Sequence, residues 1–400
     1  MSAGGWFEQL FGFKEEAPDN YGVTQAKLKY DGVSLTSKDK PDRKYTAGMF
    51  ETPSVAELRA KVNLETARSS LGGTGTCTIQ EIVDDVSAVH IRPENKGATF
   101  QAASQFNCLE HTSEEGLPEH GITCYSFDRT QGPACAISCA PGTAVRNYKV
   151  KLHKNDTGEG QSKNRQLQNL ADIEKVIKNG EPTRFFRVVS GYTMADNGSL
   201  KALNDVLAKP GIEEEVIAKL RIGVQQDTEV TCYAFGQKMH DAPDQLVTQA
   251  YCSAISVSYS RARVDLWKPF ARLILQGAYE ASFYAAVEAA LRHPDWPGSR
   301  KLYLTALGGG VFGNELQWIA DAIDKAMEKF QHVPLEVYIV SFRDPIKEFQ
   351  PLLRKWQASN RPVPGEGLAK GNANSSPAPA GSNDRQQPPP FWQRCFGRGR

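Results

Sequence analysis

The chain has 400 residues and a formal net charge of +1, with 47 basic and 46 acidic residues. This balance argues against nucleic-acid binding as the main task, because such binding needs a concentrated basic face. No apolar run is long enough to cross a membrane, and residues 1–13 lack the basic region and apolar core of a secretory signal, so we predict a cytoplasmic protein.

Eight cysteines are scattered along the chain, which favours a reducing compartment over a disulfide framework. Cys135 and Cys139 are four residues apart, with Cys124 and two histidines nearby, but no paired short-spacing motif completes a zinc site. We therefore predict neither a metal nor a cofactor.

The first half of the chain is predicted to form helices and strands after a polar N-terminal segment. Residues 1–50 are expected to be an irregular extension whose aromatic residues, between 6 and 13, fold back on the body. Pro53 and Ser54 mark the start of a helix that is expected to continue to residue 68. Strand-like runs follow at 98–106, 122–127, 144–150 and 184–189, and helices at 167–177, 200–207 and 212–220.

The second half contains the longest apolar segment of the chain. Residues 267–291 are apolar nearly all round, which is typical of a buried helix. Glu280 lies within it, and a buried carboxylate needs a charged partner or a function, of which a partner is the commoner answer. Further strands are predicted at 229–235, 247–259, 302–307 and 335–342, and helices at 316–330 and 346–361. This alternation predicts an α/β fold with a mixed sheet flanked by helices.

A glycine-rich loop separates the predicted strand at 302–307 from the predicted helix at 316–330. Gly308, Gly309 and Gly310 follow the strand directly, and glycine lets bare backbone N–H groups approach a ligand. Gly313 and Asn314 close the loop, with Asn314 as the expected N-cap. A strand, a glycine loop and a helix N-terminus together suit an anion such as a diphosphate.

Polar residues also follow the predicted strand at 98–106, in the segment from Ser104 to Glu110. Open α/β sheets place ligands at the carboxyl ends of their strands, so this segment is a candidate for ligand contact. A turn beginning at Asp128 leads into a helix of small residues. Arg146 could contact a phosphate or pair with Asp128.

The glycine loop also satisfies the dinucleotide-binding pattern G-x-G-x-x-G, at Gly308, Gly310 and Gly313. That fold places its loop after the first strand and needs an acidic residue at the end of the next strand. Here the loop comes late, and Glu336 begins its strand. A nicotinamide-dependent oxidoreductase is therefore a lesser alternative. No P-loop or serine-hydrolase motif is present.

Four segments, QFNCLE, DRTQGPACA, RNY and LGGGVFGN, together resemble the macrodomain family, whose α/β fold binds ADP-ribose. They are most similar to a divergent group that includes a bacterial effector that removes ADP-ribose from ubiquitin. The resemblance covers roughly residues 50 to 345 and implies a three-layer fold with a mixed central sheet. The poly(ADP-ribose) glycohydrolase motif Q-E-E is absent after the glycines, so its catalytic glutamate has no counterpart.

The resemblance implies which residues would contact ADP-ribose. The loop Gly309-Gly310-Val311-Phe312-Gly313 would wrap the diphosphate, with Phe312 near the distal ribose. Asn107 matches an asparagine that meets that ribose. The full set of expected contacts is Phe106, Asn107, Gln131, Gly132, Arg146, Gly308, Gly309, Gly310, Val311, Phe312, Gly313 and Asn314.

Cleavage of an ADP-ribosyl bond needs a carboxylate that activates water or orients the ribose hydroxyls. Glu110 and Asp128 are the expected catalytic residues, with Glu110 preferred. The other carboxylates near the expected cleft are Glu119 and Glu280. The predicted function is ADP-ribose binding with hydrolytic release of ADP-ribose from modified protein. The alternative is a reader that binds without turnover.

The expected organisation follows from these segments. Residues 1–50 form the N-terminal extension, 51–345 the macrodomain-like ADP-ribose-binding domain and 346–361 a C-terminal helix. Residues 362–400 are rich in Pro, Gly, Ser, Asn and Gln, and we expect a disordered tail. The expected partner is ADP-ribose or an ADP-ribosylated protein, without nucleic acid or a membrane span, and we expect a monomer.

Overall fold

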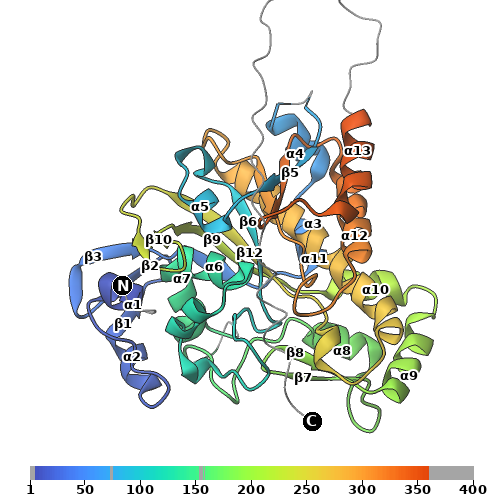
Figure 1. Ribbon diagram of the computed structural model, residues 1–400, viewed down its shortest axis with the longest axis horizontal. Helices are drawn as coiled ribbons and strands as arrows, with labels where there is room; N and C mark the ends of the chain where they lie inside the picture. The colour runs from blue at the N-terminus through green and yellow to red at the C-terminus, as the bar shows by residue number, and fades with distance from the viewer. Residues whose placement is uncertain (1–4, 73–74, 153–155, 157, 360–400) are drawn as a thin grey trace, which may run out of the picture. The chain divides into compact units, whose positions relative to one another are not determined.

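The computed structural model describes residues 5–72, 75–152, 156 and 158–359 (Figure 1). The tail predicted at 362–400 therefore lies outside the described residues. Within the described ranges, no helix combines the length and the apolar character needed to cross a membrane.

A seven-stranded mixed sheet forms the centre, in the order β4-β9-β12-β6-β13-β14-β5. The strands β12, β6, β13, β14 and β5 run parallel to one another, and β9 is antiparallel to both of its neighbours. The bounds are β4 Met49–Glu51, β5 Thr78–Val83, β6 Thr99–Ala103, β9 Gly223–Glu229, β12 Leu246–Cys252, β13 Lys301–Leu304 and β14 Glu336–Ser341.

Helices cover both faces of this sheet, which confirms the predicted α/β fold (Figure 1). On one face, α11 (Val264–Arg292) packs against β12, β6 and β13, and α12 (Leu316–Phe330) packs on α11. On the other face, α6 (Gln131–Ser138) contacts β6 and α7 (Ala140–Ala144) contacts β9. Successive β6 residues separate these faces, since Gln101 bonds to Ser282 of α11 whereas Phe100 packs with Cys135 of α6.

The N-terminal segment expected to be irregular contains regular structure. Helices α1 (Gly5–Phe11) and α2 (Tyr21–Lys27) accompany an antiparallel sheet of β1 (Leu28–Tyr30), β2 (Ser34–Ser37) and β3 (Lys40–Thr46). The aromatic residues do fold back on the body: Trp6, Phe7 and Phe11 are buried. The Trp6 indole also donates to Ser126 Oγ at 2.9 Å. These strands were not predicted from the sequence, because only one of their faces is covered and their composition is therefore polar.

Three predicted strands take a different form. Residues 122–127 and 144–150 are helical turns, a 3₁₀ turn at Thr123–Phe127 and a π turn at Val145–Lys149. Their apolar residues are three apart, as in Ile122 and Tyr125, and a helical turn buries both members of such a pair, which a strand would point to opposite faces. Of the strand expected at 229–235, only Cys232–Tyr233 (β10) forms, and the longer strand β9 lies earlier. The buried glutamines of β9 form hydrogen bonds and were not recognised as core.

The predicted helix at 53–68 is two short helices, α3 (Val55–Lys61) and α4 (Leu64–Ser70). Ser54 and Glu57 form a capping box at the start of α3. Asn63 caps α4 by accepting a hydrogen bond from the Thr66 N–H at 2.9 Å. This cap ends the predicted single helix and starts α4 as a separate helix.

The other predicted elements mostly match their ranges, whereas no element was predicted at 78–83, 86–90, 192–194 or 238–239. The helix α12 coincides with its prediction, and α11 extends its predicted range slightly at both ends. The remaining elements are α5 Val86–His90, α8 Ala171–Ile177, β7 Arg187–Val189, β8 Tyr192–Met194, α9 Asn197–Leu207, α10 Ile212–Lys219, β10 Cys232–Tyr233, β11 Lys238–Met239 and α13 Gln350–Ser359, with 3₁₀ turns at Pro93–Asn95, Pro118–His120, Val257–Tyr259 and Lys347–Phe349.

Candidate functional site

The carboxyl ends of β6, β12 and β13 meet at one edge of the sheet because these strands are parallel. The loops that follow them, at 104–111, 253–259 and 305–315, therefore lie together. Asn314 Nδ2 donates to the Ile255 carbonyl at 2.8 Å, and the Ser258 N–H donates to the Phe312 carbonyl at 3.1 Å. The glycine loop is thus fastened to the loop after β12.

The glycines of this loop have different reasons to be glycine. Gly308 has a φ of +72°, and a Cβ there would lie 2.4 Å from Ala254 Cβ. Gly313 also has a positive φ, and a Cβ on Gly309 would lie 2.9 Å from Leu316 Cδ2. Gly310 has neither requirement, because a Cβ there would meet no atom within 4 Å. Packing therefore explains the other glycines and leaves Gly310 open toward a ligand.

The same loop presents a row of free amides. No described residue accepts a hydrogen bond from the backbone N–H of Gly310, Val311 or Phe312. These amides precede the N-terminus of α12, where the helix dipole favours negative charge. The predicted N-cap was wrong: Glu315 holds that position, because the Asn314 amide is used to fasten the loop.

Three aromatic side chains gather beside the glycine loop. The Phe312 ring centroid lies 5.6 Å from that of Tyr259 and 5.4 Å from that of Tyr192, and the two tyrosine rings are 4.8 Å apart. Burial raises the pKa of Tyr259, and the nearby carboxylates of Glu114 and Asp128 raise it further. Asp128 thus lies within electrostatic range of this aromatic trio (Tyr192, Tyr259 and Phe312), and its side chain is half-buried.

A cavity of about 220 Å³ opens at the same edge of the sheet. It lies at the carboxyl ends of β5, β13 and β14, since Asp84, Thr305 and Ser341 line it. Thr305 and Ala306, which lead into the glycine loop, line it from one side. The other lining residues are Asp84, Asp85, Val86, Arg129, Thr130, Gln131, Ala134, Phe235, Val340, Ser341, Phe342 and Ile346.

Gln131 and Gly132 support the end of β6 where β13 has separated from it. Gln131 Oε1 accepts from the Ala103 N–H at 2.9 Å, and its Nε2 donates to the Gln101 carbonyl at 2.8 Å. A Cβ on Gly132 would lie 1.8 Å from the Ala103 carbonyl oxygen, so only glycine lets α6 approach this strand. Gln131 also lines the cavity, whereas the conformation of Gly132 is explained by packing.

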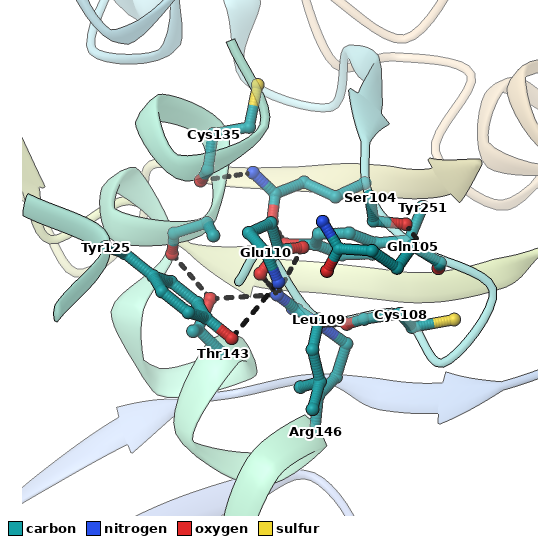
Figure 2. Close-up of polar contacts among 12 residues, drawn as sticks. Ser104, Gln105, Cys108, Leu109, Glu110, Tyr125, Cys135, Thr143, Arg146 and Tyr251 are labelled. Atoms are coloured by element: carbon teal, nitrogen blue, oxygen red, sulfur yellow. Dashed lines mark hydrogen bonds and ion pairs between the residues drawn. The ribbon is translucent and has the colours of Figure 1, made fainter. Parts of the chain in front are cut away.

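Glu110 lies behind this surface in a buried ion pair with Arg146. Figure 2 shows the Arg146 side chain directed toward Glu110, and Arg146 Nη2 lies 3.5 Å from each carboxylate oxygen. The guanidinium also donates to the Cys108 carbonyl and to Thr143 Oγ1, both at 3.1 Å, and lies over the Tyr251 ring. Arg146 thus pairs with Glu110 and not with Asp128, and neither member of the pair is exposed to solvent.

The burial of Glu110 changes its acidity. Desolvation raises the pKa of its carboxyl to about 7, although the Arg146 charge and a hydrogen bond with Tyr125 act in the opposite direction. The Glu110 N–H donates to the Tyr125 hydroxyl at 3.2 Å, which fixes the backbone of the loop here. The Glu110 carboxyl therefore gains or loses its proton near neutral pH, although its side chain is not exposed to solvent.

Asn107 and Phe106 are both buried, although they follow β6 at the expected edge. Asn107 Nδ2 donates to Gln166 Oε1 at 2.9 Å, and its Oδ1 accepts from the Leu109 N–H at 3.1 Å. Phe106 packs in the main hydrophobic core. Both polar atoms of Asn107 are therefore used within the protein, in the same loop as Glu110.

Two other carboxylates considered from the sequence have structural partners. Glu280 pairs with Arg59, at 2.7 and 3.0 Å, and with Lys329, so the expected structural pairing is confirmed. Glu119 accepts two hydrogen bonds from the Lys163 N–H, at 2.8 and 3.1 Å.

Glu336 opens β14 and so lies at the amino end of that strand, opposite the glycine loop. The oxidoreductase alternative lacks its acidic residue for this reason. Among the described residues, no group of three or more His, Cys, Asp or Glu side chains could hold a metal ion.

Several residues at this edge were not found from the sequence. Tyr192 and Tyr259 belong to segments that carry no local motif, and only packing brings them to Phe312. Asp84 and Asp85 directly follow β5 and line the cavity. Consecutive acidic residues after a strand, as at Asp84, were the one signal that could have found them.

Comparisons with known proteins gave structural neighbours and no sequence relative. No family model matches the sequence, and no curated protein matches it. The chain is similar to a poly(ADP-ribose) glycohydrolase from Deinococcus radiodurans in complex with ADP-ribose, with 13% identity over 78% of this chain and 94% of that chain, at a TM-score of 0.39. It is also similar to the glycohydrolase from Thermomonospora curvata, with 13% identity over 76% and 85% of the two chains, at a TM-score of 0.36. The fold described above is established by the chain's own sheet and helices.

Proposed function

We propose that this protein binds ADP-ribose at the carboxyl edge of the sheet and releases it hydrolytically from modified protein. The observation that carries the proposal is the row of free backbone amides at Gly310, Val311 and Phe312. This row lies at a helix N-terminus and suits a diphosphate. Its neighbours on either side, the cavity and the aromatic trio, suit the two ends of ADP-ribose.

The cavity is the proposed site of the adenine base. Phe235, Val340 and Phe342 give it apolar walls, and Asp84 and Asp85 add polar groups, a combination typical of small-molecule sites. The glycine loop follows the cavity residues Thr305 and Ala306 directly in the chain. A ligand could therefore extend from the cavity, past the amides, to the aromatic trio.

The distal ribose would lie beside the aromatic trio, within reach of Asp128. In the hydrolysis, a water oxygen bonds to the anomeric carbon while the bond to the modified side chain breaks. Asp128 accepts one proton of the water, and the leaving side chain takes a proton from the solvent, to which Asp128 later returns its own. The Asp128 side chain is half-buried, whereas Glu110 is sealed against Arg146. We therefore assign the catalytic contact to Asp128 and a supporting role to Glu110.

Binding is tested by calorimetric titration of the protein with ADP-ribose, AMP and NAD side by side. ADP-ribose should bind most tightly, since AMP lacks the diphosphate and the distal ribose, and NAD carries a nicotinamide on the anomeric carbon. Gly310→Val should abolish this binding and keep the melting temperature, because a Cβ at Gly310 meets no protein atom. Gly180→Val is the matched control, since Gly180 is equally open and lies in another loop. Unchanged affinity in folded Gly310→Val would remove the loop from the site.

A reader that binds ADP-ribose without turnover is the second candidate. The observation that favours it is the closed position of Glu110, which leaves Asp128 without a second carboxylate of the expected pair. Single-turnover release of ADP-ribose from a modified protein separates the two candidates. Tight binding without release would establish the reader.

A further inference from the structure

A groove of about 560 Å³ borders the proposed site on the side of the loop at 104–111. Gln166 lines this groove and accepts the hydrogen bond from Asn107 Nδ2. Gly191 also lines it, and a Cβ there would lie 2.9 Å from Asn107 Oδ1. Gly191 also directly precedes Tyr192 of the aromatic trio, so the groove adjoins the proposed ribose site.

The hairpin of β7 and β8 forms one side of this groove, through Val188 and Val189. A two-residue turn at Ser190 and Gly191, with φ of +47° and +81°, joins the strands. The inner strand β8 is held to the body, because the Thr193 N–H donates to Ser256 Oγ at 2.8 Å. The strand β7 is therefore the outer edge of the hairpin (Figure 1).

The backbone N–H and C=O groups of Val188 are directed away from the hairpin. Val188 pairs with Thr193, one position beyond the pair Val189 and Tyr192 that closes the turn. The closing pair of a two-residue hairpin is hydrogen-bonded, so the next pair directs its N–H and C=O groups outward. No described residue outside the hairpin bonds to these groups of Val188. Such an edge can pair with an added strand.

The groove carries an excess of negative charge. Its charged lining residues are Glu114, Glu115 and Lys163, two carboxylates against one ammonium group. The carboxylate of Glu114 also raises the pKa of Tyr259, so its field extends from the groove to the aromatic trio. A positively charged segment would find complementary charge along the groove and at the entrance of the ribose site.

On the basis of the proposed function, we propose that this groove binds the polypeptide that carries the ADP-ribosyl group. The segment lies extended along β7 and pairs with the Val188 N–H and C=O groups. Basic residues beside the modified position contact Glu114 and Glu115. The turn at Ser190 and Gly191 leads directly into Tyr192 of the aromatic trio, so the modified side chain can enter the ribose site from the groove. The substrate class is thus an ADP-ribosylated basic segment of a protein.

The probes are two peptides of equal length, each ADP-ribosylated at one central residue, flanked by lysines or by glutamates. Free ADP-ribose and the unmodified peptides are measured beside them, by calorimetry. The lysine-flanked peptide should bind about tenfold more tightly than the glutamate-flanked one, and added salt should reduce the difference. Methylation of the backbone nitrogens beside the modified residue of the lysine-flanked peptide should weaken the binding of that peptide about fivefold, since a hydrogen bond to β7 is lost.

Charge variants on the groove test the same point from the protein side. Glu115→Lys should abolish the preference for the lysine-flanked peptide, and Lys163→Glu should increase it, because both side chains are exposed in the groove. The matched control is Glu65→Lys on α4, which Figure 1 shows far from the β7–β8 hairpin. None of these variants should change the affinity for free ADP-ribose.

The outcomes separate the two proposals. If free ADP-ribose binds and the two modified peptides bind equally well, the groove proposal is overturned and the proposed function remains. If the preference is present but Glu115→Lys leaves it unchanged, the groove proposal is overturned as well. If free ADP-ribose does not bind at all, the proposed function fails and the groove proposal fails with it.

Discussion

Replacement of Glu110 by glutamine is expected to remove a pH dependence from the stability of the fold. Burial raises the pKa of the Glu110 carboxyl from its ordinary value of 4.5 to about 7. Between these values the folded state holds the proton more tightly than the unfolded state does. Glu110 therefore contributes stability that is fully present below the unfolded-state pKa of 4.5 and is lost as the pH rises through the folded-state pKa of about 7. The difference between these two pKa values corresponds to about 3 kcal/mol of unfolding free energy.

The assay is urea unfolding of the unmutated protein and Glu110→Gln at several values between about pH 5 and about pH 8. Glutamine keeps the shape of the side chain and cannot ionise. The free-energy difference between the two proteins should therefore change by about 2 to 3 kcal/mol across this range, with the unmutated protein losing stability. His90 and His111, whose pKa burial lowers to about 4, act in the opposite direction but are present in both proteins.

A second buried carboxyl supplies the control. Burial raises the pKa of Glu229 to about 6. The pH dependence of stability that Glu229→Gln removes should therefore end at a lower pH than the one that Glu110→Gln removes. Parallel stability curves for Glu110→Gln and the unmutated protein would refute the reasoning. They would show that Glu110 is already ionised at low pH, as a strongly coupled partner of Arg146.

Four further outcomes are expected. Asp128→Asn should lower single-turnover release about a hundredfold and keep ADP-ribose affinity, as for a lost general base. If Glu110→Gln loses turnover while Asp128→Asn keeps it, the catalytic role returns to Glu110. Phe312→Ala should weaken ADP-ribose binding about tenfold in calorimetry, because a stacked aromatic surface is removed. Gly308→Ala should lower the melting temperature, at a cost of about 2 kcal/mol, since the positive φ and the Ala254 contact both oppose a side chain. Truncation at Arg361 should leave both melting temperature and binding unchanged, and a clear fall in either would contradict the composition argument for the tail.

The sequence by itself determined the elements whose periodicity is strong. The apolar residues of α12 recur at helical spacing from Leu316 to Phe330, and the helix has those bounds. The strand, glycine loop and helix at 301–330 follow from local signals, because apolar runs and glycines control backbone conformation over a few residues. The mixed α/β character follows from the same alternation of elements.

Only the tertiary structure decided how the candidate site is assembled. Arg146 was an open choice between a phosphate and Asp128, and the fold places it against Glu110, from a helical turn that was predicted as a strand. Tyr192, Tyr259 and Phe312 come from three segments whose meeting no local pattern encodes.

The physical reason is the range over which each property acts. Backbone conformation depends on neighbours within a turn or a strand, and a sequence window contains those neighbours. Ion pairing, access to solvent and pKa depend on which distant segments pack together and on how completely they exclude water. The sequence therefore indicated that a carboxylate follows β6, at Glu110, and the packed fold decided that this carboxylate is buried against Arg146 while Asp128 stays half-buried.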